Sequence, residues 1–204
     1  MTGASTEVSK GDLTRRRILD AAAAEIARHG PAGASLNAIA AAADLRTGSL
    51  YFHFASKQRL VEAVLEEGIR ASLQRLDAMA VPTGTPAQRL RAGVHAHLRA
   101  LAELSDYAVV VLAPPFSVDA ELDGFRTLRR EYLRRWAGLI ADAQADGTLA
   151  AGPEPGEVRD LLLGALNAAG LAGQDPGRTA DAVFALLRLP SGPGTPGGGA
   201  PRTP

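Results

Sequence analysis

The sequence predicts an all-α fold of about nine helices, because apolar residues recur at spacings of three and four through most of it. Ile18, Ala22 and Ile26 form one such stripe. A second observation is that residues typical of helix starts, such as Ser35 and Asp175, stand directly before periodic segments. A third is composition, because 46% hydrophobic residues in a chain of 204 can build the core of one large domain or two small ones.

The charge balance and the lack of cysteine exclude several classes of protein. The net charge is zero, so any affinity for nucleic acid has to come from a local basic patch. Residues 10–60 supply one, with eight basic side chains against four acidic ones. Without cysteine there are no disulfides, thiolate metal sites or cysteine nucleophiles. The sequence shows no signal-peptide pattern and no apolar run that spans a bilayer, so we expect a cytoplasmic protein without a membrane partner.

The N-terminal region predicts a polar arm followed by a long helix. Residues 1–11 are small and polar, and we expect them to be disordered. An alternative is that this arm reaches DNA phosphates through Lys10 and the arginines that follow it. The helix should run from Leu13 until Gly30 ends it in a left-handed conformation, and Pro31 prevents its continuation.

Residues 35–57 predict two short helices joined by a tight turn. Ser35 is the N-cap of the first helix, which carries apolar residues at helical spacing as far as Ala43. Asp44 interrupts the pattern, and the second helix is expected from Thr47 to His53. Two helices joined in this way form a helix-turn-helix unit, whose second helix can enter the major groove of DNA.

Leu13 to Leu65 resembles the DNA-binding domain of the TetR family of transcriptional regulators. The matching features are the first helix TRRRILDAAAAEIARHG, the pattern S-x-x-x-I-A-x-x-A, a turn, and the string L-Y-F-H-F-x-S-K-x-x-L, whose Y-F-H-F-x-S-K part is the most specific. The resemblance implies a DNA-binding domain at 12–56. The DNA contacts that it implies are Ser35, Asn37, Arg46, Thr47, Gly48, Ser49, Tyr51, His53 and Lys57.

Two residues depart from the family pattern, and one contact has a simpler alternative. Asp44 stands in the turn where the family usually has glycine, although Asp accepts a left-handed backbone better than most residues. Arg46 stands where a small polar residue is common, so the base sequence that it reads is expected to be unusual. Lys57 is either a solvated surface lysine or a phosphate contact assisted by backbone N–H groups at the start of its helix.

Residues 57–189 predict a second helical domain. Thr85 and Gln88 form a capping box for one of its helices. His95 and His97 point in different directions on that helix, so we interpret them as polar or packing residues and not as a metal pair. Tyr107–Leu112 is a strand or a buried helix by composition, and its all-helical surroundings favour a short helix.

The last three predicted helices differ in character. Asp119–Asp146 carries five arginines outside its apolar face, interpreted as a solvated surface, with a site for an anionic ligand as the alternative. Glu157–Ala172 and Pro176–Leu189 mix large and small apolar residues, and they carry more apolar surface than a small domain hides. Residues 190–204 cannot bury apolar area and are expected to be a disordered tail.

The resemblance implies that the second domain binds an effector and a second subunit. A mostly apolar lining suits a hydrophobic small molecule, and plain core is the alternative for each candidate. The lining candidates are Leu73, Leu98, Tyr107, Phe116, Phe125 and Trp136. The string LLLGALN, Leu161–Asn167, is similar to the C-terminal region of TetR regulators that respond to acyl-CoA esters, but Ala168 stands where an aromatic residue often follows. The expected homodimer contacts are Leu162, Ala165, Leu166, Ala169, Val183, Leu186 and Leu187.

These patterns predict a regulator, most simply a repressor that leaves a near-palindromic operator when it binds its effector. An activator, or a structural DNA-binding protein without a ligand, remains open, because the motif only binds DNA. An enzyme is not expected. The sequence has no glycine-rich phosphate loop, nucleophile elbow or metal-spaced cluster, and it implies no cofactor.

Overall fold

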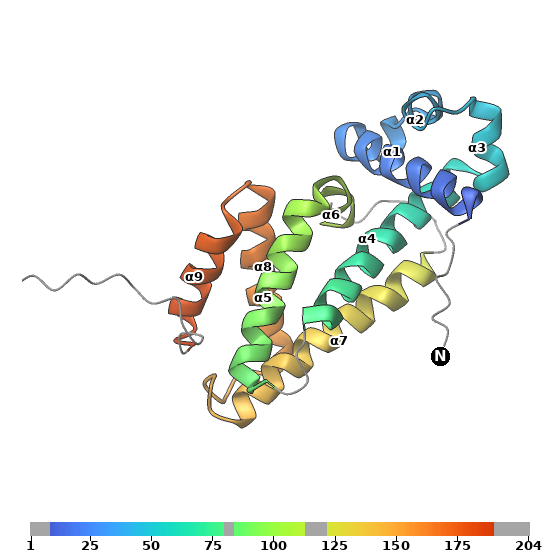
Figure 1. Cartoon of the computed structure of the whole chain (residues 1–204). Coiled ribbons are helices and arrows are strands. Elements are labelled where there is room, and N and C mark those ends of the chain that lie inside the picture. The colour runs from blue at the N-terminus through green and yellow to red at the C-terminus, as the bar shows by residue number, and fades with distance from the viewer. Residues whose placement is uncertain (1–8, 80–83, 113–121, 190–204) are drawn as a thin grey trace, which may run out of the picture.

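The computed structural model describes residues 9–79, 84–112 and 122–189, and every regular element in these ranges is a helix, as predicted. Figure 1 shows their arrangement. The helices are α1 (Lys10–Gly33), α2 (Leu36–Ala42), α3 (Thr47–His53), α4 (Lys57–Met79), α5 (Pro86–Glu103), α6 (Ser105–Leu112), α7 (Asp123–Ala145), α8 (Pro155–Leu171) and α9 (Pro176–Leu186). Most of the expected arm, the whole expected tail and Phe116 lie outside the described residues.

Helix α1 starts at Lys10, three residues before the predicted start at Leu13. The Ser9 side chain caps it by accepting a hydrogen bond from the Asp12 backbone N–H. Lys10 and Gly11, expected in the disordered arm, are therefore helical. The break at Gly30 is as predicted, since this residue has a φ of 69°, and one further helical turn follows it.

The turn between α2 and α3 adopts the left-handed conformation expected at Asp44, whose φ is 58°. The Leu45 backbone N–H bonds to the Ala40 carbonyl at 2.9 Å, which closes the end of α2. Ser35 caps the start of α2 by accepting from the Ala38 N–H at 3.4 Å. Local signals thus define the start and the end of α2, whereas α3 begins after Arg46 without a side-chain cap.

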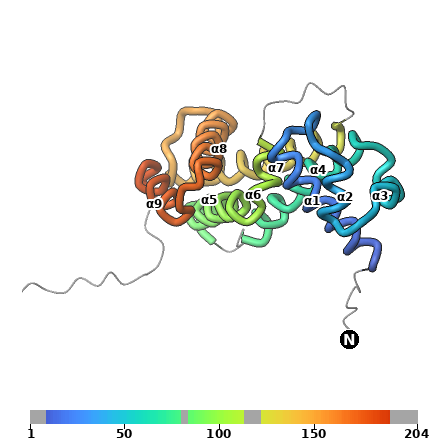
Figure 2. The backbone as a smooth tube through the Cα atoms, turned by 90° about the horizontal axis from the view of Figure 1, so that it is seen from above, coloured from blue at the N-terminus to red at the C-terminus, as the bar shows by residue number. Residues whose placement is uncertain are grey.

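The described residues form two hydrophobic cores. One lies under α1, α2 and α3, and it also takes in the first half of α4 together with Tyr107 and Val110 of α6. The other lies among α4, α5, α7, α8 and α9, with Trp136, Ile140 and Leu166 fully buried at its centre. Figures 1 and 2 show α4 running from the first group of helices into the second. A displacement of α4 therefore changes the packing in both domains.

Several helices of the second domain begin and end at or near the predicted residues. The capping box of Thr85 and Gln88 is present at the start of α5, and residues 105–112 form a helix. Helix α9 ends at Leu186, three residues earlier than predicted, because Arg188 has a φ of 53° and Leu189 turns back to bond the Phe184 carbonyl. No helix in the described ranges is long and apolar enough to cross a membrane.

Candidate functional site

The predicted DNA contacts lie on α2, α3 and the first turn of α4, at the upper right of the molecule in Figure 1. Ser35, Asn37, Arg46 and Gly48 are exposed, and Tyr51 exposes 51% of its surface. Thr47, Ser49, His53 and Lys57 are half-buried. No acidic residue stands within α3 itself, so its outer face carries donors and neutral groups toward solvent.

Three hydrogen bonds fix the reading unit, by which we mean α2, α3 and the first turn of α4: one lies within it and two join it to α1. The Thr47 hydroxyl donates to Asn37 Oδ1 at 2.8 Å, which links α3 to α2. The Lys57 ammonium donates to the Ala32 carbonyl at 2.8 Å, so in the free protein it ties the start of α4 to the end of α1. Glu25, 8% exposed on α1, accepts from the Ser35 N–H at 3.1 Å and fixes the start of α2.

Two aromatic side chains of the same unit were not singled out by sequence. Phe52 is 92% exposed at the surface of α3, whereas Phe54 is buried. The Arg15 guanidinium lies over the Phe54 ring, 4.5 Å from its centroid, which holds one basic group of α1 beside the end of α3. The string Y-F-H-F gives no sign of which phenylalanine faces water.

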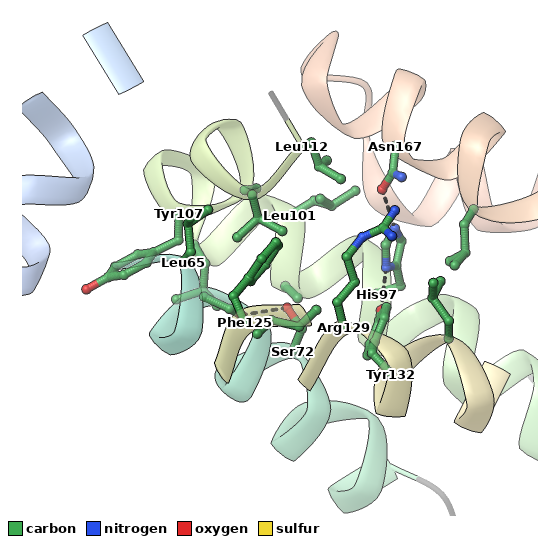
Figure 3. A pocket seen from close by; sticks show the side chains of 18 of the residues that line it. Leu65, Ser72, His97, Leu101, Tyr107, Leu112, Phe125, Arg129, Tyr132 and Asn167 are labelled. Carbon is green, nitrogen blue, oxygen red and sulfur yellow. Dashed lines mark hydrogen bonds between the residues drawn. The ribbon is translucent and has the colours of Figure 1, made fainter. Parts of the chain in front are cut away.

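A cavity of about 710 Å³ opens between α4, α5, α6, α7 and α8. Of the predicted lining residues, Tyr107 and Phe125 are in its wall, and Figure 3 shows both. Leu73, Leu98 and Trp136 are instead packed in the core of the second domain, 8%, 2% and 0% exposed. For these three the plain-core alternative holds, because their side chains fill the centre of the bundle and not the cavity.

The cavity has a polar wall that sequence analysis missed. His97 of α5 lies between Tyr132 of α7, whose hydroxyl is 2.7 Å from His97 Nδ1, and Asn167 of α8, whose Oδ1 is 2.9 Å from His97 Nε2. Figure 3 shows the three side chains in a row. Burial lowers the pKa of His97 to about 4, against a smaller opposing effect of the Asn167 hydrogen bond, so this imidazole is neutral at pH 7.

The cavity wall also touches the first domain. The ring of Tyr107 lines the cavity, and its hydroxyl donates to Asp20 Oδ1 of α1 at 2.8 Å. Burial, and then the bond to this carboxylate, raises the pKa of Tyr107 above its ordinary value, so the phenol stays protonated and keeps donating. Asp20 in turn pairs with Arg16 at 3.3 Å, and Arg16 with Glu67 of α4 at 2.6 Å.

The predicted dimer residues divide into two sets. Leu162, Leu166 and Val183 are 7%, 0% and 9% exposed in the single chain, so they belong to its own core and are not available to a second subunit. Ala165 is exposed, Ala169 and Leu187 are half-buried, and Leu186 is 83% exposed. Leu161 and Leu171, 77% and 52% exposed, were not predicted. The exposed apolar residues of α8 and α9, which we call the outer face, are therefore Leu161, Ala165, Leu171 and Leu186.

Sequence profiles match both halves of the chain. The profile of bacterial regulatory proteins of the tetR family matches residues 18–64, and that of the tetracyclin repressor-like C-terminal domain matches residues 83–170. The HTH-type transcriptional repressor KstR2 of Mycolicibacterium smegmatis is 26% identical over 136 residues. This alignment spans 66% of this chain and 66% of KstR2, just under two thirds of each.

Solved structures share the fold. AibR, solved in complex with isovaleryl coenzyme A and operator DNA, superposes with a TM-score of 0.73 at 22% identity, covering 87% of this chain and 100% of AibR. The fatty acid degradation regulator FadR from Bacillus halodurans gives a TM-score of 0.72 at 21% identity, covering 85% of this chain and 94% of FadR. At these identities the likeness establishes the arrangement of helices and nothing finer.

Proposed function

This chain belongs to the tetR family of bacterial regulatory proteins, and we propose that it is a homodimeric repressor that releases a near-palindromic operator when an effector fills the cavity. The family is one of transcriptional regulators, so the chain is not an enzyme. The observation that carries the proposal is the placement of α4. It begins at the reading unit with Lys57 and forms the cavity wall with Leu65, Gly68, Ile69 and Ser72.

The reading unit suits the major groove. Arg46, exposed just before α3, can make a bidentate contact to guanine, which carries about 1–3 kcal/mol of base discrimination. We expect Lys57 and Tyr51 to contact phosphates, as the family resemblance implies. When DNA arrives, the Lys57 ammonium exchanges the Ala32 carbonyl for a phosphate, a stronger acceptor because it is charged.

The outer face of α8 and α9 suits a second subunit. Leu161 and Leu186 are large apolar side chains that lie almost wholly in water in the single chain. Small residues such as Ala165 beside them allow the helices of two subunits to approach closely. A two-fold dimer presents two α3 helices roughly 34–36 Å apart, one turn of DNA, which requires an operator with two related half-sites.

The cavity suits an apolar effector, and an acyl-CoA ester is the first class to test. Leu163 and Asn167, from the string that resembles acyl-CoA-responsive regulators, both line the cavity, whereas Leu162 and Leu166 face the core. AibR, which shares the fold, was solved with isovaleryl coenzyme A. The departure at Ala168 has no effect on the lining, since this residue is exposed and outside the cavity wall.

The experiment has two stages, both with the full chain. Selection from random DNA should give a near-palindrome, which is then titrated with apolar acids and their CoA esters. Because coupling is reciprocal, an effector should weaken DNA affinity by the same factor by which DNA weakens effector affinity, typically about 1–3 kcal/mol. Trp136 reports binding by fluorescence, since the chain has a single tryptophan and its ring centroid lies 5.9 Å from that of His97.

Three outcomes separate the alternatives. Release of the operator by a bound molecule supports a repressor that responds to its effector. Binding that changes Trp136 fluorescence but leaves operator affinity unchanged contradicts the switch. An effector that raises operator affinity and transcription together indicates the activator.

A further inference from the structure

The five arginines of α7, predicted as a solvated face, are not equivalent. Four have partners: Arg126 with Asp123 at 3.6 Å, Arg130 with Thr127 at 3.0 Å, and Arg134 and Arg135 with Glu131. Among residues 9–79, 84–112 and 122–189, Arg129 has no hydrogen bond or ion pair. Its charge only adds, after the hydrogen bond from Arg159, to the lowering of the pKa of Asp160. The Arg129 side chain lines the cavity, and Figure 3 shows it directed toward His97 and Asn167.

The hydrogen-bonded row beside Arg129 fixes which groups it presents. Asn167 Oδ1 can only accept, so His97 Nε2 carries the proton and donates to it at 2.9 Å. Because the imidazole is neutral, Nδ1 is then the acceptor, and the Tyr132 hydroxyl donates to it at 2.7 Å. The carbonyl oxygen of Asn167 is thus occupied by His97. Its amide NH₂ group, with two N–H donors, has no protein partner in the described part of the chain.

The polar wall therefore presents donors. Arg129 contributes a guanidinium with five N–H groups and a full positive charge, and Asn167 contributes an amide NH₂. The acidic side chain in the wall, Asp160, is bound by Arg159 through two hydrogen bonds of 2.8 and 3.0 Å. The charge of Asp160 is therefore balanced by a residue outside the wall, as the charge of Arg126 is by Asp123, and among the described residues Arg129 is left as the wall's cation without an ion pair.

The remainder of the cavity is apolar. It is lined by Leu65, Ile69, Leu101, Leu104, Val111, Leu112 and Phe125. A ligand that matches both parts has an apolar body and a head whose oxygens only accept hydrogen bonds and carry negative charge. Arg129 is exposed and Asn167 is half-buried. A purely hydrocarbon ligand would cover the Asn167 amide without giving it a partner, which is costly, and would leave the Arg129 charge unused.

We propose that Arg129 and the Asn167 NH₂ group form an anion subsite, and that the effector is an apolar molecule with an anionic oxygen group bound there. Tyr132 and His97 do not contact this group. They are positioning residues that hold the Asn167 amide with its donors toward the ligand. The proposal rests on the cavity being the effector site, and it narrows the effector from hydrophobic molecules in general to anionic amphiphiles. The anionic oxygens belong either to a free carboxylate or to the phosphates of a coenzyme A ester, which is one recognition chemistry from two sources.

The test measures binding alone, by calorimetry and Trp136 fluorescence, so that it does not depend on operator release. The probes are octanoate, octanoyl-CoA and the neutral octanamide, each titrated into wild type, Arg129→Gln and Asn167→Leu. The matched control is Arg130→Gln, one residue along α7, whose side chain bonds Thr127 and does not line the cavity. Circular dichroism verifies that each variant is folded.

We expect octanoate or octanoyl-CoA to bind wild type, and octanamide to bind at least about tenfold more weakly than the better of the two, because hydrogen bonds to charged groups are the stronger kind. Arg129→Gln should weaken the anionic probe about 10- to 100-fold and leave octanamide unchanged, whereas Arg130→Gln changes neither. Preference for octanoate identifies a carboxylate in the subsite, and preference for octanoyl-CoA identifies the phosphates.

Asn167→Leu separates the subsite from a nonspecific effect of charge. It should weaken the anionic probe at low and at high salt alike, because it removes a short-range donor, whereas part of the Arg129→Gln loss disappears at high salt. Equal affinity for octanamide and the anionic probes, equal effects of Arg129→Gln and Arg130→Gln, or no binding of any probe at millimolar concentration would overturn the anion subsite. Operator release by a neutral apolar molecule would overturn it too, while leaving the repressor proposal standing.

Discussion

The outer leucine of α9 gives the sharpest test of the proposed dimer. Leu166, a candidate from sequence, does not, because it is 0% exposed and Leu166→Glu would unfold the single chain before it reported on assembly. Leu186→Glu places the charge on a side chain that is 83% exposed, so the folded monomer tolerates it. In the dimer the same carboxylate would be buried without a partner.

The magnitude follows from the exposed leucines. Full burial of a leucine contributes about 1.5–3 kcal/mol, and Leu161 and Leu186 each have about four fifths of their surface to bury. Two such residues from each of two subunits supply about 5–10 kcal/mol toward association. Leu186→Glu removes half of this in both copies, so the dimer dissociation constant should rise by roughly two to three orders of magnitude.

Analytical ultracentrifugation from nanomolar to micromolar concentration measures the effect, with urea unfolding to verify that the variant stays folded. Leu13→Glu is the matched control, because Leu13 is also exposed (56%) but lies on α1 and not on α8 or α9. This variant should remain dimeric. The reasoning is refuted if Leu186→Glu sediments as a dimer like the wild type, or if the wild-type protein is itself monomeric at micromolar concentration.

The other predictions concern DNA, proton uptake and coupling. Arg46→Ala should relax base preference at one position of each half-site, and an unchanged binding-site logo would make it a surface residue. Lys57→Ala should weaken binding to all sequences and lower the slope of log affinity against log salt by about one, whereas an equal slope removes it from the interface. Because burial lowers the pKa of His97 to about 4, this imidazole binds a proton between pH 6.5 and pH 4 in the unfolded chain but not in the native state. The free energy of unfolding should therefore decrease as the pH is lowered through this window, by up to about 3 kcal/mol more in wild type than in His97→Gln. Urea unfolding measures this, and parallel pH profiles of the two proteins would contradict the burial argument. Tyr107→Phe removes the bond to Asp20 and should reduce the effect of the effector on operator affinity more than it reduces effector binding; an unchanged coupling factor would place the signal elsewhere.

Local signals allowed much of the first domain to be predicted. Ser35, Gly30 and Asp44 each act on the backbone within a few residues, so their consequences can be read from the chain itself. The same holds for the capping box of Thr85. These interactions require no knowledge of what packs against the helix, which is why their predicted positions agree with the structure.

The cavity and the outer face depend on packing between distant helices, and periodicity does not encode them. In the run Leu161–Leu163 the first side chain faces outward while the next two are buried, although all three are chemically equal. Phe125 and Trp136 stand on the same helix, yet one lines the cavity and the other fills the core. His97 acquires its environment only when α5, α7 and α8 converge, so its isolated position on α5 gave no signal.

The contacts around Gly68 explain why α4 and α6 should respond to an effector as one body. A Cβ at Gly68 would lie 2.9 Å from Val111 Cγ2 and 3.3 Å from Tyr107 Cβ, so the two helices approach each other as closely as a glycine permits. A molecule that displaces the Tyr107 ring therefore also displaces α4 at this point, since packed interiors have little room to absorb a shift. Both helices reach α1 by polar contacts, Tyr107 through Asp20 and Glu67 through Arg16, and Arg16 also pairs with Asp20. We therefore expect the signal to reach the reading unit along α4 itself and through this polar cluster on α1, and so to change the separation of the two α3 helices in the proposed dimer.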